Sequence, residues 1–297
     1  MSDEQSMRIG WIGAGIMGAA MAEHLLIAGH QLTVHSRTPG KAGSLLDQGA
    51  TWADSPAQAA DGADVAFSMV GYPEEVESVH LGREGTLAAA RPPAVIVDMS
   101  TSRPSLAVKI AQAAKARGVG AVDAPVSGGP TGARQGTLSI MVGAAERDIS
   151  LVRPVLELMG DNIVHHGGSG AGQHAKMVNQ ILVAANLTGV CEGLLYAQRA
   201  GLDPLRVIDS VGSGVADSWS VRNFGPRMAK RDFEPRFYAE YFLKDLSIAL
   251  EEASRMGLVL PGLALARQLY EAVKAQGHGR KGIQALLLAL ERLNGIG

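Results

Sequence analysis

The sequence predicts an α/β protein in which an N-terminal Rossmann-type, mainly parallel sheet is followed by an all-α C-terminal domain. Three observations predict this fold: a glycine-rich loop between an apolar run and a helical pattern, an alternation of strands and helices, and a helical pattern over nearly all of the remainder. At 297 residues the chain is long for a single core. We therefore expect two domains, residues 1–168 and 169–297.

The composition excludes several classes of protein. A hydrophobic content of 46% with 19% charged residues describes a globular chain with a large core, and a net charge of −2 gives no general attraction to nucleic acids or acidic membranes. No apolar run is expected to reach the length of a membrane span, and residues 1–7 do not resemble a signal peptide. We expect a cytoplasmic protein, with neither nucleic acid nor membrane as partner, and with Cys191 as a small core residue.

The first candidate site is a loop with glycines at 13, 15 and 18. An apolar run from Ile9 leads into this loop, and a helical pattern follows from Met17 to Leu26. The first glycine permits a sharp turn, the second lets the backbone approach a pyrophosphate, and the third lets the helix pack close to the strand. The N–H groups and the positive dipole end of the helix then face an anion. The loop therefore predicts a bound dinucleotide.

The end of the second predicted strand, Gln31–His35, indicates which dinucleotide binds. An NAD site has an acidic residue about 20 positions beyond the glycines, whereas residues 35–41 contain no carboxylate. Arg37 can stack on adenine and pair with a 2′-phosphate. Further donors follow beside it, at Ser36, Thr38 and Lys41. NADP is therefore favoured and NAD remains possible; the alternative is that these residues form only a solvated helix start.

Further strands are expected at residues 65–70, 94–98, 119–123 and 138–142. Ligands of parallel sheets lie beyond the carboxyl ends of the strands, so the segments that follow are candidate binding loops. These segments are residues 70–73, 99–102 and 124–130, and prolines at positions 73 and 104 are expected to start helices. Together with the glycine loop they predict one continuous rim of a binding cleft.

A run of glycines at residues 167–172 marks the predicted domain junction. The helix that follows is expected to run from about residue 173 to 200, long enough to lie along the interface between the two parts. Lys176, Asn179 and Gln180 fall at i, i+3 and i+4, hence on one face near its start. Later helices are predicted over residues 204–211, 238–256 and 261–275.

Lys176 is the best candidate for the proton donor that hydride transfer to a carbonyl requires. Partial desolvation and nearby cations would lower its pKa toward neutrality, although a surface lysine is the alternative interpretation. Asn179 and Gln180 supply amides suited to a hydroxyl or a carboxylate. The segment Ser127-Gly128-Gly129 is expected to form an anion nest for a substrate carboxylate, with a plain loop as the alternative.

Other polar features have ordinary structural interpretations. Asp98 and Asp123 are as readily turn caps as catalytic groups. His165-His166 is interpreted as a strand end, and no metal site is expected because no further ligand stands at a suitable spacing. The basic stretch 222–236 is interpreted as a solvated, partly packed loop, and Lys244-Asp245 as an exposed ion pair of little energetic weight.

The chain resembles the β-hydroxyacid dehydrogenase family, which includes 3-hydroxyisobutyrate dehydrogenases and the tartronate semialdehyde and succinic semialdehyde reductases. Four ordered motifs carry the resemblance: Gly13–Gly18, Asp123–Gly129, Gly170–Gln173 with Lys176 and Asn179, and Lys244–Leu246. The resemblance implies that Lys176 is the catalytic lysine. It implies further that the substrate is bound by Ser127, Gly128 and Gly129 and by one or both of Asn179 and Gln180.

The resemblance also implies contacts with the cofactor. Thr101 matches a threonine that contacts the cofactor, and Lys244 matches a late lysine that closes over it. Ser36-Arg37-Thr38 looks like the Arg-Thr form of the NADP-using members. The complete set of expected cofactor contacts is Gly13, Ala14, Gly15, Ile16, Met17, Gly18, Ser36, Arg37, Thr38, Lys41, Val70, Gly71, Glu75, Thr101 and Lys244.

The sequence thus predicts reversible hydride transfer between NADP(H) and a small β-hydroxy acid or semialdehyde acid, with Lys176 as general acid and base. One alternative is an imine reductase on the same fold, which the lysine disfavours because those relatives usually carry another residue there. The other is a non-catalytic NADPH-binding protein. The apolar faces of the helical domain predict a homodimer or homotetramer.

Overall fold

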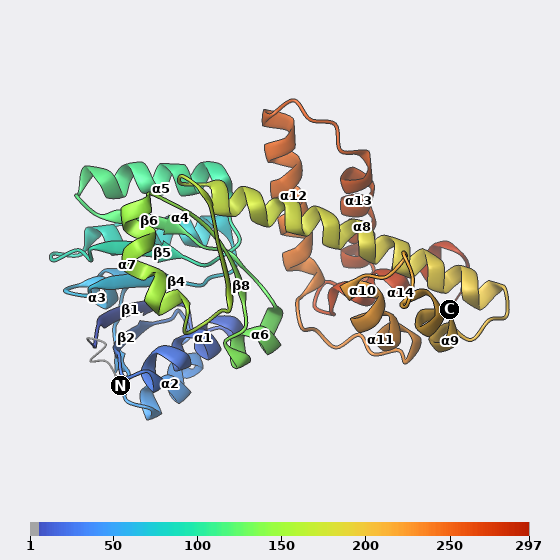
Figure 1. Ribbon diagram of the computed structural model, residues 1–297, viewed down its shortest axis with the longest axis horizontal. Coiled ribbons are helices and arrows are strands. Elements are labelled where there is room, and N and C mark those ends of the chain that lie inside the picture. The colour runs from blue at the N-terminus through green and yellow to red at the C-terminus, as the bar shows by residue number, and fades with distance from the viewer. Residues whose placement is uncertain (1–5, 297) are drawn as a thin grey trace. The chain divides into compact units, whose positions relative to one another are not determined.

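The computed structural model describes residues 6–296, and Figure 1 shows the course of the chain. Contacts between residues divide it into two units, Met1–Lys176 and Met177–Gly297. The division falls inside the longest helix, α8 (Ala171–Arg199), whose first residues belong to unit 1 and whose remainder belongs to unit 2. The glycine-rich stretch at residues 167–172 lies at the start of this helix.

Unit 1 is built on one sheet with the strand order β3-β2-β1-β4-β5-β6-β8-β7, and β9 pairs with β8. Neighbours from β3 to β6 pair in parallel, whereas β8 runs antiparallel to β6. The predicted α/β class with a mainly parallel sheet is therefore confirmed. The strands are β1 (Arg8–Ile12), β2 (Gln31–His35), β3 (Thr51–Trp52), β4 (Val65–Ser68), β5 (Val95–Asp98), β6 (Gly120–Asp123), β7 (Val126–Ser127), β8 (Ser139–Ala144) and β9 (Asn162–Gly167).

Helices cover both faces of this sheet (Figure 1). One face packs on α1, α2 and α7, and the other on α3, α4 and α5. Prolines 73 and 104 start α4 and α5 as predicted, because a proline lacks only an N–H that has no partner there anyway. The helical segments are α1 (Ile16–Ile27), η1 (Pro39–Ala42), α2 (Gly43–Asp47), α3 (Pro56–Ala60), α4 (Pro73–Leu81), η2 (Thr86–Ala88), α5 (Pro104–Ala116), α6 (Gly129–Gln135) and α7 (Glu146–Leu156).

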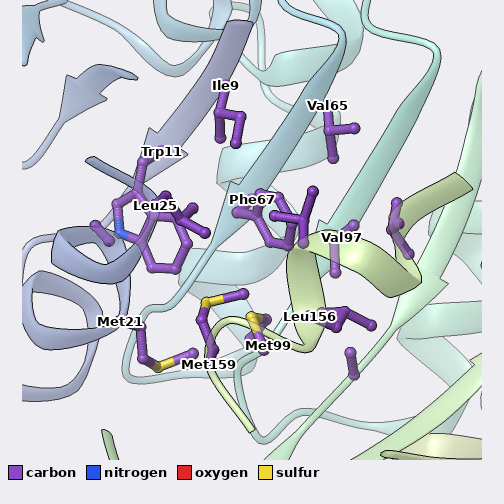
Figure 2. Close-up of a cluster of buried hydrophobic side chains, with 14 of the residues drawn as sticks. Ile9, Trp11, Met21, Leu25, Val65, Phe67, Val97, Met99, Leu156 and Met159 are labelled. Atoms are coloured by element: carbon purple, nitrogen blue, oxygen red, sulfur yellow. The ribbon is translucent and has the colours of Figure 1, made fainter. Parts of the chain in front are cut away.

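The central strands β4 and β5 are buried along their whole length and are apolar except for Ser68 and Asp98 at their carboxyl ends, because both faces of the sheet are covered. Successive residues point to opposite faces, so Phe67 of β4 belongs to one core cluster and its neighbour Ala66 to another. Trp11 stacks on Phe67 with ring centroids 5.5 Å apart, and Figure 2 shows Met21 and Leu25 of α1 beside them. This packing holds the carboxyl end of β1, where the glycine loop begins.

Unit 2 is helical throughout its named elements, as predicted for the C-terminal domain. Its core gathers around Leu187, Phe242, Leu246 and Tyr270, and the Tyr270 hydroxyl donates to the carbonyl oxygen of Ile283 at 2.7 Å. Besides its part of α8, the helical segments are α9 (Pro204–Val211), α10 (Trp219–Asn223), α11 (Gly225–Ala229), α12 (Ala239–Arg255), α13 (Pro261–Ala275), η3 (Ile283–Ala285) and α14 (Leu286–Leu293).

Helix α8 corrects one expectation from composition. By length and hydropathy it is able to cross a membrane, so the expectation that no apolar run reaches that length is wrong. A single such helix is weak evidence of a span, because core helices of soluble proteins pass the same test. The helix buries Ala184, Leu187 and Cys191 in the core of unit 2, and the interpretation of Cys191 as a core residue is confirmed.

The stretch 222–236 differs from its prediction as a loop. It contains the end of α10 and all of α11, and Phe224 and Phe233 lie in the core of unit 2. These helices have only five residues each, too few for a hydrophobic period to show in the sequence. The prediction of a strand at His165-His166 is confirmed by β9, where His165 Nε2 lies 2.9 Å from the carbonyl oxygen of Ala144.

Candidate functional site

The strand order reverses direction between β1 and β4, which are neighbours in the sheet. In open parallel sheets the crevice at such a reversal, outside the carboxyl ends of the strands, binds the ligand. The loop Gly13–Gly15 follows β1 there, the loop Met69–Tyr72 follows β4, and residues 99–103 follow β5. Val70, Gly71 and Thr101 are half-buried in these loops. These are the loops that the sequence places around a cofactor.

Glycine stands at the three positions of the first loop for different structural reasons. Gly13 has a φ of 102°, and a Cβ there would lie 2.2 Å from the carbonyl oxygen of Met69. A Cβ on Gly18 would lie 2.0 Å from the carbonyl oxygen of Gly13. A Cβ on Gly15, by contrast, would meet nothing within 4 Å. The protein's own packing therefore requires Gly13 and Gly18, whereas Gly15 leaves open a cradle that a side chain would fill.

The N-terminus of α1 is suited to an anion. Its N-cap is Gly15, no side chain caps it, and its first turn carries no acidic residue. The first N–H groups of a helix have no acceptor within the helix, and the dipole places partial positive charge at this end. The open cradle and the uncapped helix end together fit the pyrophosphate of a dinucleotide. Ala14, Ile16 and Met17 lie in the same turn, and Ile16 is 62% exposed.

Arg37 lies just after β2 with its side chain exposed, and Ser36 beside it is buried. The guanidinium pairs with Glu75 Oε1 at 2.7 Å. The second oxygen of Glu75 accepts a hydrogen bond from the backbone N–H of Gly71 at 2.8 Å. Thr38 and Lys41 are exposed. The ion pair from Arg37 to Glu75 is a feature that sequence reasoning missed, because the two residues lie 38 positions apart and share no motif.

Lys176 is buried, with 6% of its surface exposed, so it is not a surface lysine. Its Nζ donates to the carbonyl oxygen of Val126 at 2.8 Å. Val126 begins the short strand β7, and Gly128 and Gly129 follow with φ values of 131° and 60°, a conformation that favours glycine. The fold thus brings the predicted catalytic lysine to the start of the predicted carboxylate loop, in which Ser127 is half-buried.

Unit 2 holds the other predicted site residues in one hydrogen-bonded chain. Asn179 Nδ2 donates to Gln180 Oε1 at 2.7 Å, and Gln180 Nε2 donates to Asp245 Oδ2 at 2.5 Å. Lys244 Nζ lies 2.9 Å from Asp245 Oδ1, with only 13% and 0% of the two side chains exposed. The prediction of an exposed ion pair here is therefore wrong. Adjacent residues of a helix point in different directions, so the sequence alone does not show that α12 buries Asp245 and leaves little of the Lys244 side chain exposed.

Asp98 and Asp123 act as caps of backbone turns. Asp98 Oδ1 accepts from the backbone N–H of Ser100 at 3.1 Å and from the hydroxyl of Ser68 at 2.8 Å. Asp123 accepts from the backbone N–H of Gly170 at 2.6 Å and from that of Gln173 at 2.9 Å. Burial raises the pKa of Asp123 to about 6 despite these two hydrogen bonds.

Residues 6–296 contain no group of three or more His, Cys, Asp and Glu side chains arranged to hold a metal ion. The described side chains of the candidate site are suited to acid–base chemistry and anion binding. Lys176, buried with its Nζ against the carbonyl oxygen of Val126, is a candidate for proton exchange with a bound molecule.

Two family models together match nearly the whole chain. Residues 8–168 match the NAD binding domain of 6-phosphogluconate dehydrogenase. Residues 170–290 match a domain described as NAD-binding of NADP-dependent 3-hydroxyisobutyrate dehydrogenase. The boundary between the two matches falls at the glycine-rich stretch that precedes α8.

Individual proteins agree with these matches. The chain is 42% identical to 2-hydroxy-3-oxopropionate reductase of Escherichia coli, over 96% of this chain and 97% of the relative. Among solved structures, 3-hydroxyisobutyrate dehydrogenase of Mycobacterium tuberculosis with L-serine has a TM-score of 0.88 and 31% identity, covering 96% of this chain and 99% of the other. Psf3 in complex with NADP+ and 2-OPP has a TM-score of 0.85 and 26% identity, covering 95% and 99%.

These relatives share both the sheet domain and the helical domain with this chain, over nearly their full lengths. The agreement extends from the glycine loop to the last helices, so it covers every element that carries a predicted site residue. The chain belongs to the β-hydroxyacid dehydrogenase family and is an NAD(P)-dependent hydroxyacid dehydrogenase of the 3-hydroxyisobutyrate dehydrogenase type.

Proposed function

We propose that the protein catalyses reversible hydride transfer between NADP(H) and a small β-hydroxy acid or semialdehyde acid, with Lys176 as the general acid and base. The observation that carries this proposal is the contact of the buried Lys176 Nζ with the carbonyl oxygen of Val126, directly before Ser127-Gly128-Gly129. A proton donor and an anion-binding loop in contact with each other suit a substrate that carries both a carbonyl and a carboxylate.

In reduction, Lys176 donates a proton to the carbonyl oxygen of the substrate, and in oxidation it removes the proton from the hydroxyl. Ser127, Gly128 and Gly129 hold the carboxylate and thereby orient the reacting carbon. Asn179 and Gln180 supply amides to the same substrate. The nicotinamide, when bound, supplies or accepts the hydride.

The cofactor is held by residues of the loops after β1, β2, β4 and β5. The first turn of α1 binds the pyrophosphate, and Val70, Gly71 and Thr101 line the loops beyond β4 and β5. Arg37 binds the 2′-phosphate with help from Ser36, Thr38 and Lys41, Glu75 pairs with Arg37, and Lys244 closes over the cofactor. The absence of a carboxylate from residues 35–41 and the NADP+ bound to the relative Psf3 support NADP.

The proposal is tested by Lys176→Ala together with a screen of substrates and cofactors. Oxidation of 3-hydroxyisobutyrate, glycerate, 4-hydroxybutyrate and serine is measured with NADP+ and with NAD+. The variant should lose about 10²- to 10⁴-fold in kcat on the best substrate, since that is what positioned proton transfer contributes. Its affinity for NADPH, followed by fluorescence, should change less than about threefold, because cofactor contacts remain intact.

Each part of the proposal has its own contrary result. Near wild-type turnover by Lys176→Ala would reject the lysine as general acid and base. A lower KM for NADH than for NADPH would reject the preference for NADP. Oxidation of none of the hydroxy acids would reject the substrate class.

We propose further that unit 2 pairs with a second copy of the chain to form a homodimer or homotetramer. Helix α8 exposes Val178, Leu182 and Tyr196 at 57%, 58% and 76%, and exposed apolar residues of this size are typical of an interface. Light scattering at micromolar concentration should give two or four times the mass of 30.9 kDa. A monomer at that concentration would contradict the assembly.

A further inference from the structure

Gln173 lies in the first turn of α8 and is completely buried. Its side-chain Nε2 donates to the carbonyl oxygen of Ser100 at 2.8 Å, and its Oε1 accepts from the backbone N–H of Ser102 at 2.8 Å. Both ends of one amide are therefore bonded to the backbone of the loop that follows β5. An apolar side chain of similar size would fill this space but would leave a buried carbonyl and a buried N–H without partners.

The loop that Gln173 holds is itself joined to the loop after β4. The hydroxyl of Ser100 accepts from the backbone N–H of Val70 at 2.9 Å, and the backbone N–H of Ser100 donates to Asp98 at 3.1 Å. A continuous path of hydrogen bonds thus runs from the loop at Val70, through Ser100, to the side chain of Gln173. The residues at either end of this path belong to the proposed cofactor loops and to the helix that carries Lys176.

The start of α8 is held equally tightly from its other side. Asp123 accepts from the backbone N–H groups of Gly170 and Gln173. A Cβ on Gly172 would lie 2.3 Å from the carbonyl oxygen of Met141 and 2.6 Å from that of Asp123, so the helix presses directly on the sheet. The first turn of α8 therefore has little freedom to shift or rotate.

Lys176 follows Gln173 by three residues, so the two side chains emerge from the same face of α8, one turn apart. Whatever fixes the rotation of that turn also fixes the place where Nζ meets the carbonyl oxygen of Val126. Proton transfer needs such precision, because a misplacement of about 1 Å can cost about 10²-fold in rate. A buried amide that is bonded at both its oxygen and its nitrogen specifies one rotation, whereas an apolar side chain tolerates several.

We propose that Gln173 is a positioning residue for proton transfer, which locks the first turn of α8 to the loop at Ser100–Ser102 and thereby holds Lys176 Nζ in register with the carboxylate loop. The inference rests on the proposed role of Lys176. It assigns to Gln173 no contact with substrate or cofactor.

The first test compares Gln173→Met, which keeps the volume but removes both hydrogen bonds, with His174→Ala as the matched control. His174 is the next residue of the helix and is exposed. Gln173→Met should lower kcat about 10- to 100-fold, while KM and the affinity for NADPH change less than about threefold. His174→Ala should match wild type in all three. Wild-type kcat in folded Gln173→Met protein would overturn the inference.

The pH dependence of kcat in Gln173→Glu distinguishes a positioning role of Gln173 from a purely structural one. A carboxylate can accept from the Ser102 N–H, but its second oxygen repels the Ser100 carbonyl oxygen. Burial and the neighbouring Asp123 carboxylate raise the pKa of such a glutamic acid, while the Lys176 side chain one turn along the helix lowers it. On protonation it donates to Ser100 and restores both bonds. The ratio of its kcat to that of wild type should therefore rise as pH falls from 8 to 6, while the ratio for Gln173→Met stays constant. A ratio for Gln173→Glu that does not vary with pH would overturn the inference.

The double variant separates this inference from the proposed function. If Gln173 acts through Lys176, adding Gln173→Met to Lys176→Ala should not lower the residual rate further. A full additional loss would overturn the inference and leave the role of Lys176 standing. If Lys176→Ala retains wild-type turnover, the proposed function fails on that variant alone, whatever Gln173 does.

Discussion

The two units bury polar groups in different ways. Around the candidate site, unit 1 uses backbone partners: Asp98 and Asp123 accept from backbone N–H groups, and Gln173 bonds a loop at both ends of its amide. The site residues of unit 2 instead bond to other side chains, through the pair of Lys244 and Asp245 and the amide of Gln180 that Asp245 holds. Backbone partners follow from the fold, whereas side-chain partners depend on which helices meet.

This difference separates two kinds of binding. Loops held by backbone bonds present N–H groups in a fixed array, which suits the phosphates that every dinucleotide shares. Side chains held by other side chains are exchanged by single mutations, which suits the part of a site that distinguishes substrates. We infer that the backbone-held loops of unit 1 are suited to the phosphates of the cofactor.

The largest effect on stability is expected when the buried charge of Asp245 in unit 2 is removed. Asp245→Ala removes the buried carboxylate that the Lys244 ammonium and the Gln180 amide both contact. Breaking a buried ion pair by removing one member costs roughly 3–5 kcal/mol. We expect a loss of this size in the free energy of unfolding, measured by urea titration.

A matched control for that variant is Glu271→Ala, which removes the half-exposed pair of Glu271 with Arg267 in the same unit. Exposed pairs at this helical spacing contribute about 0.3–0.5 kcal/mol. Equal losses in the free energy of unfolding for the two variants would show that burial does not strengthen the pair at Asp245.

The polar interior of unit 1 predicts an effect of pH instead. His80 is buried with its Nε2 2.9 Å from the Ser68 hydroxyl, and burial lowers its pKa to about 4. Between pH 6.5 and 4 the unfolded chain binds a proton that folded His80 does not, so stability falls on acidification. Asp123 has the opposite effect on stability. Its pKa of about 6 lets the folded state bind a proton that the unfolded chain does not, so stability rises on acidification.

In the wild type these two contributions nearly cancel. Asp123→Asn removes only the contribution of Asp123. When the pH is lowered from 6.5 to 4.5, the free energy of unfolding of the variant should therefore fall by about 2 kcal/mol more than that of wild type. Urea titrations of both proteins at the two pH values measure the difference. Parallel changes in wild type and variant would mean that Asp123 titrates near its ordinary pKa.

Most of unit 1 was predictable because its signals are local. The strand at Gln31–His35 alternates, and prolines 73 and 104 mark helix starts, so the expected bounds agree with the structure. The short elements β3, β7 and α6 were not predicted, since two to seven residues carry no periodicity that can be measured.

The site was predictable only as far as its motifs reach. Lys176 and the glycine loop stand in segments whose spacing has a chemical meaning, and the structure places Lys176 against the segment that begins with Val126. The partners that hold such residues lie far away in sequence. The bonds from Gln173 to the loop at Ser100 and from Gln180 to Asp245 arise only from the tertiary fold, so composition and spacing could not indicate them.

Within the glycine loop, Gly18 is required for packing, whereas Gly15 is proposed to serve cofactor binding. Gly15→Ala adds a methyl group where nothing lies within 4 Å, so the midpoint of thermal unfolding should remain near that of wild type. The same methyl group enters the space proposed for the pyrophosphate, and the Kd for NADPH should rise at least about tenfold, which is about 1.4 kcal/mol. Gly18→Ala is the comparison, since its methyl group would lie 2.0 Å from the carbonyl oxygen of Gly13 and should destabilise the fold. Unchanged NADPH affinity in Gly15→Ala would contradict the cradle.

The smallest expected effect concerns the ion pair of Arg37 with Glu75. Glu75 partly neutralises Arg37, so a 2′-phosphate must compete with this carboxylate for the guanidinium. Glu75→Gln keeps an acceptor for the Gly71 N–H but removes the competing charge. The Kd for NADPH should fall about two- to fivefold, the scale of an exposed pair of charges, while the Kd for NADH stays constant. Arg37→Ala should instead raise the Kd for NADPH relative to the Kd for NADH. If Glu75→Gln instead weakens NADPH binding, Glu75 acts by orienting Arg37 toward the phosphate more than by competing with it, and the carboxylate belongs to the binding site itself.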